Sequence, residues 1–412
     1  MTILRIVSYG GIAEVGRSCF MIEDRDRRIL VDCGIKLIPK RPSDKPKILN
    51  DTIRPYEFDA IVLTHGHLDH SGFIPRLFQE GFKRKFLLTP PTKEILKVLY
   101  NDMLKIQRDN LFGAKAAKMS LKKALTLNYK KWKKITDGVR IKFYDAGHVL
   151  GSSSILIDWD GTTILYSGDI KVEKTPFHSG SKVPETEIDL LIIEATNALR
   201  EVPPRDIVIE ELIRDVKKTL ENGGKVLIPS LAYGRSQEIL FELVKASIPD
   251  EYPIILDGML LKINKIYKKY LRRPWLSREA IQLCKEKNIS WIDEYDNIVK
   301  GFRRNGKERE KIAKDKEPMI ILSTSGMLEG GPIHTYLLHT AHQQNNLLAL
   351  VNYQVPGTLG RQIEEGARYV ELTSSDGRVF EINLKLRVKK YELSGHATLE
   401  GLIKYVEKAD PK

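Results

Sequence analysis

Cysteine is scarce in this sequence, with three residues in 412. Cys19, Cys33 and Cys284 are well separated, which excludes both a disulfide framework and a Cys-x-x-Cys zinc site. We therefore expect a reducing compartment, the cytoplasm. Long apolar runs are also missing, since no stretch approaches the ~20 residues that a membrane span needs. The first residues predict a strand and not a signal peptide, so no contact with a membrane is expected.

Acidic residues are scarce in one part of the chain. Between Lys83 and Lys142, 17 Lys and Arg stand against 4 Asp and Glu, a net of +13 that equals the net charge of the whole chain. We expect helices from Thr92 to about Trp132. A solvated helical face explains such a stretch, and so does a surface that binds a polyanion. Composition leaves both open, and a phosphate-bearing substrate would favour the second.

The chain is longer than one hydrophobic core usually supports, so we expect two domains. Short strands dominate its first part. From residue 203 to 351, helices alternate with apolar strands, which is typical of a parallel sheet covered by helices. Strands return after Gly357. The predicted domains are 1–197 and 357–412, which together form one domain, and 198–356, which is inserted between them.

The motif with the most evident chemistry is Leu63-Thr64-His65-Gly66-His67-Leu68-Asp69-His70. The apolar run before it predicts a buried strand, and side chains that alternate along a strand would point His65 and His67 the same way. Asp69 and His70 would follow at the turn into a helix. Imidazole and carboxylate are ligand types that zinc accepts. A lone histidine is usually a core residue, but three histidines and an aspartate at this spacing favour a metal site.

Two more candidate ligands, His148 and Asp169, each follow a predicted strand. Each stands beside glycine, which lets the backbone approach a metal closely. A carboxylate can bridge two metals, although Asp169 alone would more often be a turn residue. Glu194 ends a further apolar strand.

Together these residues resemble the metallo-β-lactamase family. Asp32 matches an early aspartate that orients a ligand in that family. The α/β block after Glu194 and the histidine near the C-terminus, His396, are similar to its β-CASP branch, which processes nucleic acids. The expected α/β fold is an αββα sandwich with an inserted α/β cap that contains a parallel sheet. Cap motifs of the branch are matched by the runs 229–238, 323–331 and 357–361. Within the branch, the chain resembles archaeal relatives of the cleavage and polyadenylation specificity factor nuclease, without KH domains, and ribonuclease J.

The resemblance implies two zinc ions per chain. It assigns His65, His67 and His148 to the first ion, Asp69, His70 and His396 to the second, and Asp169 with a hydroxide to the bridge between them. Two such ions lower the pKa of a bridging water and stabilise both oxygens of an in-line displacement at phosphorus. The residues expected to be catalytic are Asp69, Asp169, Glu194 and His396. For Glu194, proton handling and the orientation of a ligand histidine remain equally open.

RNA is the expected substrate, because members of the branch that act on RNA carry histidine at the position of His396 and the DNA-repair members carry valine. Candidate phosphate ligands are Arg235, Ser323, Ser325, Gly326 and Arg361. An ordinary strand-to-helix loop would also explain the Ser/Thr/Gly run, and we prefer the phosphate interpretation only because the metal site points to the same kind of substrate. One departure concerns Gln362, where the eukaryotic nuclease carries a histidine thought to act as general acid. Another group, such as His334, His339, His342 or a water, would then protonate the leaving oxygen.

The predicted function is zinc-dependent hydrolysis of RNA in processing or decay, with endonuclease and 5′→3′ exonuclease action both open. A catalytically weak or silent RNA-binding subunit is the alternative, against which all seven ligand positions are filled. A small-molecule metallo-hydrolase would not need the cap. The expected partner is RNA, and a homodimer and an RNA-processing or exosome-type complex remain open.

Overall fold

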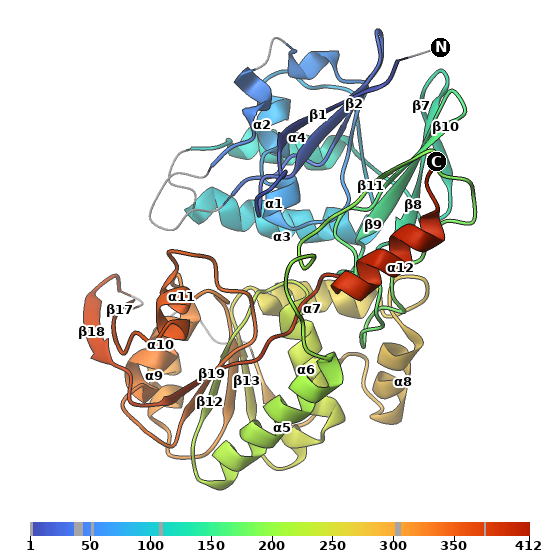
Figure 1. Cartoon of the computed structure of the whole chain (residues 1–412). Coiled ribbons are helices and arrows are strands. Elements are labelled where there is room, and N and C mark those ends of the chain that lie inside the picture. The colour runs from blue at the N-terminus through green and yellow to red at the C-terminus, as the bar shows by residue number, and fades with distance from the viewer. Residues whose placement is uncertain (1–2, 37–43, 51–52, 107–109, 301–305, 375) are drawn as a thin grey trace. The chain divides into compact units, whose positions relative to one another are not determined.

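The structure, a computed structural model, describes the chain except for residues 1–2, 37–43, 51–52, 107–109, 301–305 and 375. The chain separates into two compact units (Figure 1). The first consists of Met1–Arg200 with His396–Lys412, and the second of Glu201–Gly395. Each unit is built around its own sheets.

Two sheets form the first unit. The strands of one sheet follow the chain order, antiparallel from β1 to β3 and parallel from β3 to β6. They are β1 (Arg5–Gly10), β2 (Cys19–Glu23), β3 (Arg28–Val31), β4 (Ala60–Val62), β5 (Lys85–Leu88) and β6 (Ala124–Thr126). The other sheet has the order β11-β10-β9-β8-β7, so β7 is an edge strand. Its strands are β7 (Trp132–Thr136), β8 (Val139–Asp145), β9 (Ser153–Trp159), β10 (Thr162–Tyr166) and β11 (Leu190–Ile192).

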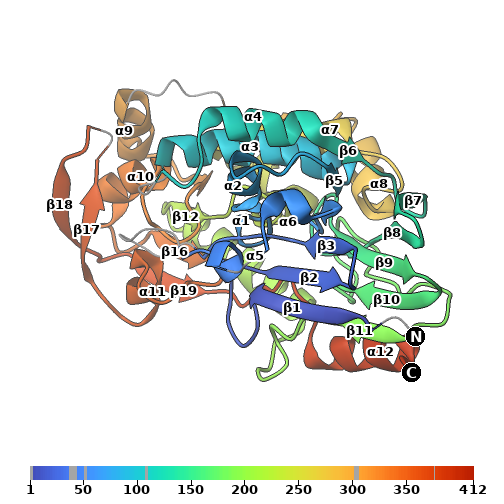
Figure 2. The ribbon, with the colours of Figure 1, turned by 90° about the horizontal axis from the view of Figure 1, so that it is seen from above.

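Helices cover the outer faces of these two sheets (Figure 2). They are α1 (Leu68–Ser71), α2 (Ile74–Gln79), α3 (Pro90–Ile106), α4 (Ala114–Lys123) and α12 (Leu399–Ala409), with 3-10 turns at Lys47–Asn50 and Pro55–Glu57. Alternate residues of β2 to β5 share one buried cluster with α2 to α4. Leu156 of β9 and Leu165 of β10 share another with α12. Between the sheets, the rings of Phe20 and Tyr166 lie 5.6 Å apart. This arrangement confirms the predicted αββα sandwich.

The lysine-rich stretch departs from its prediction. The helical pattern was expected to continue to about Trp132, but α4 ends at Lys123 and the chain continues in β6 and β7. β6 pairs with β5 and β7 pairs with β8, and Ile135 is buried on the second pair. Pairing and burial outweigh the weak local preference of a Lys-rich segment. The basic stretch therefore contains strands as well as the helices α3 and α4.

The second unit contains a six-stranded sheet of order β14-β13-β15-β12-β16-β19, in which every neighbouring pair is parallel. Its strands are β12 (Val226–Pro229), β13 (Ile254–Asp257), β14 (Ile298–Val299), β15 (Ile320–Ser323), β16 (Leu347–Leu350) and β19 (Arg387–Lys390), and β17 (Tyr369–Thr373) and β18 (Val379–Asn383) form a separate hairpin. Its helices are α5 (Arg205–Glu221), α6 (Arg235–Lys245), α7 (Leu260–Lys269), α8 (Arg278–Glu286), α9 (Gly306–Lys314), α10 (Pro332–Thr340) and α11 (Leu359–Glu364), with 3-10 turns at Ile248–Asp250 and Ile292–Glu294. The predicted parallel sheet with covering helices is confirmed.

Residues 357–395 lie in the second unit, whereas the sequence placed 357–412 with the first domain. The difference arises because β19 pairs in parallel with β16 and so extends the second sheet. The strand itself was predicted, but its charged sequence Arg387-Val388-Lys389-Lys390 gives no sign of its partner. The predicted limits of the inserted domain stay a prediction.

Over the residues described, no helix combines the length and the apolar character needed to cross a membrane.

Candidate metal centre

The histidine motif lies in the first unit, directly after β4. The strand ends at Val62, and residues 63–67 lead into the short helix α1, which begins at Leu68. His65 is fully buried, and its Nε2 lies 3.0 Å from Nδ1 of His67. The predicted convergence of these two rings therefore occurs, but in the loop after the strand rather than on the strand.

His148 joins this pair from the loop after β8. Its Nε2 lies 3.3 Å from Nδ1 of His67. His65, His67 and His148 make up one of three groups whose possible ligand atoms all lie within 4.8 Å of one another. This is the set that the sequence assigned to the first ion.

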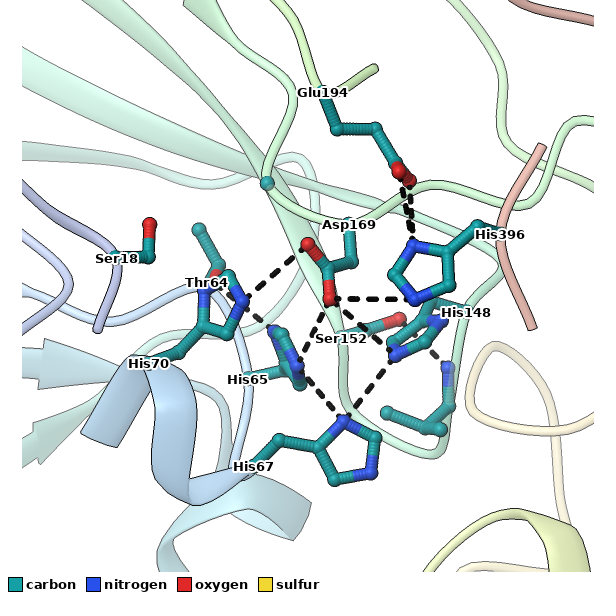
Figure 3. A network of polar contacts seen from close by, with 12 residues as sticks. Ser18, Thr64, His65, His67, His70, His148, Ser152, Asp169, Glu194 and His396 are labelled. Atoms are coloured by element: carbon teal, nitrogen blue, oxygen red, sulfur yellow. Dashed lines mark hydrogen bonds and ion pairs between the residues drawn. The ribbon is translucent and has the colours of Figure 1, made fainter. Parts of the chain in front are cut away.

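Asp169 lies among the histidines and belongs to both other groups (Figure 3). Its Oδ2 is 3.6 Å from His65 Nε2, 3.7 Å from His148 Nε2 and 4.0 Å from His396 Nε2, and its Oδ1 is 3.3 Å from His70 Nε2. The residue before it must be glycine, because Gly168 has φ of +58° and a Cβ there would lie 2.8 Å from Thr64 Cγ2. Asp169 thus lies close to four histidines and is shared by two of the candidate ligand groups.

Asp32 anchors His70 from behind. Its Oδ2 lies 2.7 Å from His70 Nδ1, and its Oδ1 accepts a hydrogen bond of 2.8 Å from the Thr64 amide. Asp32 has no exposed surface. The Thr64 hydroxyl contacts Asp32 and also lies 3.1 Å from His65 Nδ1. One buried carboxylate therefore fixes two histidine rings, one of them through Thr64.

Glu194 performs the same task for His396. Its Oε2 is 2.9 Å from His396 Nδ1, and its Oε1 accepts a hydrogen bond of 2.7 Å from the Ile170 amide. The His396 carbonyl accepts a 2.8 Å hydrogen bond from the buried ammonium of Lys171. Side chain and backbone of His396 are therefore both held.

The charges in the cluster shift its pKa values in opposite directions. Burial, aided by the charge of His70, lowers the pKa of His65 well below its usual range. Burial also lowers the pKa of His396, but the carboxylates of Glu194 and Asp169 outweigh it and raise the pKa to about 9. Burial raises the pKa of Asp169, yet His70 and His396 bring it well below its usual range. The cluster thus combines concentrated positive and negative charge in a buried place, as ion-binding and catalytic sites do.

The donor set suits a metal ion. His65, His70 and His396 each turn Nδ1 to an outer partner and Nε2 toward Asp169. Ligand histidines in proteins are held in this way, with one nitrogen fixed and the other presented to the metal. Imidazole with carboxylate suits zinc among other divalent metals. The His/Asp cluster can therefore hold metal, and the identity and number of ions belong to the proposal below.

Asp69 is the predicted ligand that joins none of the three groups among the described residues. It is partly exposed at the first turn of α1, and its charge contributes to the raised pKa of His396. Its assignment to the second ion stays a prediction.

The predicted phosphate ligands belong to the second unit. Ser323 ends β15 beside Pro229 at the end of β12, so Ser325 and Gly326 follow at the carboxyl edge of the parallel sheet, a usual place for ligands. A Cβ on Gly326 would lie 2.7 Å from the Leu231 amide, which explains the glycine. The guanidinium of Arg235 is engaged by Glu238 and by the Leu393 carbonyl at 3.0 Å, and Arg361 pairs with Glu365 on α11. Their roles toward phosphate stay predictions.

Of the histidines considered as proton donors, His334 has both ring nitrogens engaged in hydrogen bonds to the backbone. Its Nε2 lies 2.7 Å from the Leu328 carbonyl, and its Nδ1 accepts a 3.1 Å hydrogen bond from the Thr373 amide. Gln362 is exposed on α11. The source of the proton thus remains open among the other candidates.

Sequence reasoning missed three residues near these sites. Thr64 links Asp32 to His65, and Lys171 holds the His396 carbonyl. Ser230 is buried, and its hydroxyl has no hydrogen-bond partner among the described residues. Its backbone packs against Gly326, where a Cβ would lie 2.9 Å from the Ser230 carbonyl carbon. Thr64 and Ser230 stand inside the motifs, so proximity was a usable signal, whereas nothing in the sequence links Lys171 to a histidine far along the chain.

Comparison with known proteins agrees with this geometry. The Metallo-beta-lactamase superfamily matches residues 12–209, and the Beta-Casp domain matches residues 236–363. An "RNase J-like protein" of Methanocaldococcus jannaschii is 35% identical over 407 residues, which cover 97% of this chain and 88% of the relative. "Transcription termination factor FttA" of the same organism is 33% identical and covers 99% of this chain, but the chain spans 65% of that relative's length. A crystal structure of a protein of unknown function from Enterococcus faecalis V583 matches 100% of this chain and 92% of the solved chain. The TM-score is 0.59 at 15% sequence identity, so the two proteins share the fold.

Proposed function

The chain belongs to the metallo-β-lactamase superfamily and carries its Beta-Casp domain, and on this premise we propose that it is a zinc-dependent ribonuclease. The predicted class, a metal-dependent hydrolase, is confirmed by the family. The proposal adds RNA as the substrate, zinc as the metal, two ions per chain and a role in RNA processing or decay. We place the reaction in the cytoplasm, in keeping with three buried cysteines that form no disulfide among the described residues.

One observation carries the proposal: three groups of ligand atoms overlap, and Asp169 belongs to two of them. We assign His65, His67 and His148 to one ion, His70, His396 and Asp69 to the other, and Asp169 to both. When bound, such a pair lowers the pKa of a shared water and stabilises charge on the phosphoryl oxygens. Asp32 and Glu194 hold His70 and His396 in place for this task.

RNA is preferred as substrate on two grounds. The names of both relatives from M. jannaschii refer to RNase J and to transcription termination, and RNA is central to both. The sequence also places a histidine at position 396, as the RNA-acting members of the branch do. A silent RNA-binding subunit is disfavoured because all seven predicted ligand positions are filled in the sequence, and six of them belong to the ligand groups.

A circular RNA tests the proposal and separates its two modes of action. We expect the zinc-loaded chain to cleave linear RNA, and the EDTA-treated chain and an Asp169→Ala variant to leave it intact. Cleavage of an internally labelled circle would establish endonuclease action, because a 5′→3′ exonuclease has no end from which to start. Linear and circular RNA both surviving with zinc and with manganese would overturn the ribonuclease proposal.

A further inference from the structure

The β7–β8 hairpin of the first unit presents one polar face that the metal centre does not use. Trp132 pairs with Lys142 across the two strands, and Lys134 pairs with Arg140. Cross-strand partners lie on the same face of a sheet, and so do residues two apart on one strand. Trp132, Lys134, Arg140 and Lys142 therefore share one face, which we name the hairpin face.

An exposed tryptophan dominates the hairpin face. The Arg140 guanidinium lies 4.4 Å from the centroid of the Trp132 ring, and the Lys142 ammonium lies 4.3 Å from it. Trp132 remains 38% exposed, whereas Trp159, Trp275 and Trp291 are buried. A large aromatic ring that contacts two cations and is partly open to solvent offers both stacking and positive charge.

Positive charge surrounds the ring. Lys142 has no ion-pair partner among the described residues, while Arg140 pairs with Asp158 at 2.7 Å and Lys134 with Asp137 at 2.5 Å. A hollow of about 500 Å³ lies beside Ile135 and Thr136, at the end of β7. Its cationic lining residues are Lys83, Arg84, Lys85 and Lys123, and its acidic lining residue, Asp59, is already paired with Arg84. Cations outnumber acidic residues here, and such an excess of positive charge favours a polyanion as the occupant.

Protection of a sheet edge is the simpler explanation of lysines here, since Lys on an edge strand discourages pairing with another chain. It accounts for Lys133 and Lys134 on β7. It does not account for Arg140 and Lys142, which lie on β8 and not on the edge, and an exposed tryptophan on the edge strand works against it.

We propose that the hairpin face is an accessory binding site for single-stranded RNA, in which a base stacks on Trp132 while Arg140 and Lys142 contact phosphates. The inference rests on the proposed function for the identity of its ligand. Lys142 precedes His148 by six residues, so their Cα atoms lie at most about 22 Å apart. One RNA strand can therefore contact both the hairpin face and the metal centre.

The test uses the full chain in EDTA, so that no metal-dependent cleavage occurs, with a labelled oligoadenylate of about 16 nucleotides. We expect Trp132→Ala and Trp132→Leu to weaken binding by about tenfold and Trp132→Phe to retain most of it, because stacking needs an aromatic face. RNA should also quench tryptophan fluorescence in the native chain and not in Trp132→Phe, since Trp132 is the exposed tryptophan. Lys142→Gln should reduce the slope of log affinity against log salt by about 0.7. Lys217→Gln, at an exposed position on α5 of the other unit, should leave the slope unchanged.

Unchanged affinity and unchanged quenching in the Trp132 variants, in a chain that still cleaves RNA, would remove the accessory site and leave the ribonuclease proposal standing. A native chain that neither binds nor cleaves RNA would remove both. A change in oligomeric state with Trp132→Ala, with RNA affinity intact, would assign the hairpin face to a contact between copies of the chain instead.

Discussion

Glu194 and His396 stand 202 positions apart in the sequence, and the carboxylate of the first holds the ring of the second. Both carboxylate oxygens lie near His396 Nδ1, at 2.9 and 3.1 Å. Oε1 also accepts a hydrogen bond from the Ile170 amide. With both oxygens engaged, orientation of His396 is favoured over proton handling for Glu194.

Replacing Glu194 by glutamine should therefore act on the metal. We expect Glu194→Gln to weaken zinc binding by about 10- to 100-fold, the usual effect of removing an outer hydrogen-bond partner. Competition with a zinc-chelating dye measures this without reference to activity. Glu407→Gln, an exposed glutamate on α12, is the matched control. Unchanged zinc affinity with lost activity would instead support proton handling.

Metal content is the second prediction. The overlapping groups around Asp169 lead us to expect about two zinc ions per chain. Elemental analysis of protein purified without chelators measures this number, and dialysis against EDTA should lower both the number and the unfolding temperature, because bound metal stabilises the folded state. A chain that contains no transition metal and takes none up would refute the metal centre.

The chemistry of the site could be predicted from local sequence motifs. Its geometry could not, because it depends on contacts between residues far apart in the sequence. His65, His67 and His70 stand together, so their convergence needed no knowledge of the fold. The position of Asp169 between His70 and His396 depends on how β10 and the C-terminal segment pack. The hold of Lys171 on the His396 carbonyl is likewise a tertiary fact, since 225 positions separate the two residues.

The same distinction applies to the fold. Apolar strands such as β12, β13 and β15 are evident from composition, because both faces of a covered parallel sheet are buried. β7 and β19 are rich in lysine and arginine, and each is defined by the strand with which it pairs. Charged edge strands carry little hydrophobic pattern, so the sequence did not predict β7 and gave no partner for β19.

A third prediction concerns the stability of the first unit. Asp24, in the turn between β2 and β3, accepts hydrogen bonds from the Arg27 amide at 2.8 Å and the Trp159 indole at 3.0 Å, and it pairs with the Arg27 guanidinium. Burial raises the pKa of Asp24, but these partners outweigh it and bring the pKa well below its usual value. A lowered pKa in the folded state gives stability that is present above the unfolded pKa of about 3.9 and is lost as pH falls through the folded value.

Asp24→Asn should therefore lower the free energy of unfolding by about 2 kcal/mol at neutral pH and by less at about pH 3. Urea unfolding at both pH values measures the difference. Asp26→Asn in the same turn is the control, because Asp26 is exposed and makes no ion pair among the described residues. A loss of equal size at both pH values would show that shape and not charge explains the role of Asp24.

The last prediction concerns His396 itself. We expect His396→Ala to reduce RNA hydrolysis by more than about 100-fold and zinc content from about two ions to about one, because the second ion loses a ligand. The backbone should stay in place, since Lys171 binds the carbonyl of residue 396 and the Ala397 amide donates to the Ile170 carbonyl at 2.7 Å. Far-UV circular dichroism should therefore match that of the native chain. Glu407→Ala, at an exposed position of α12 in the same unit, should leave rate and zinc content unchanged. Full activity with two zinc ions in His396→Ala would exclude His396 as a ligand and leave its contact with Glu194 as structural.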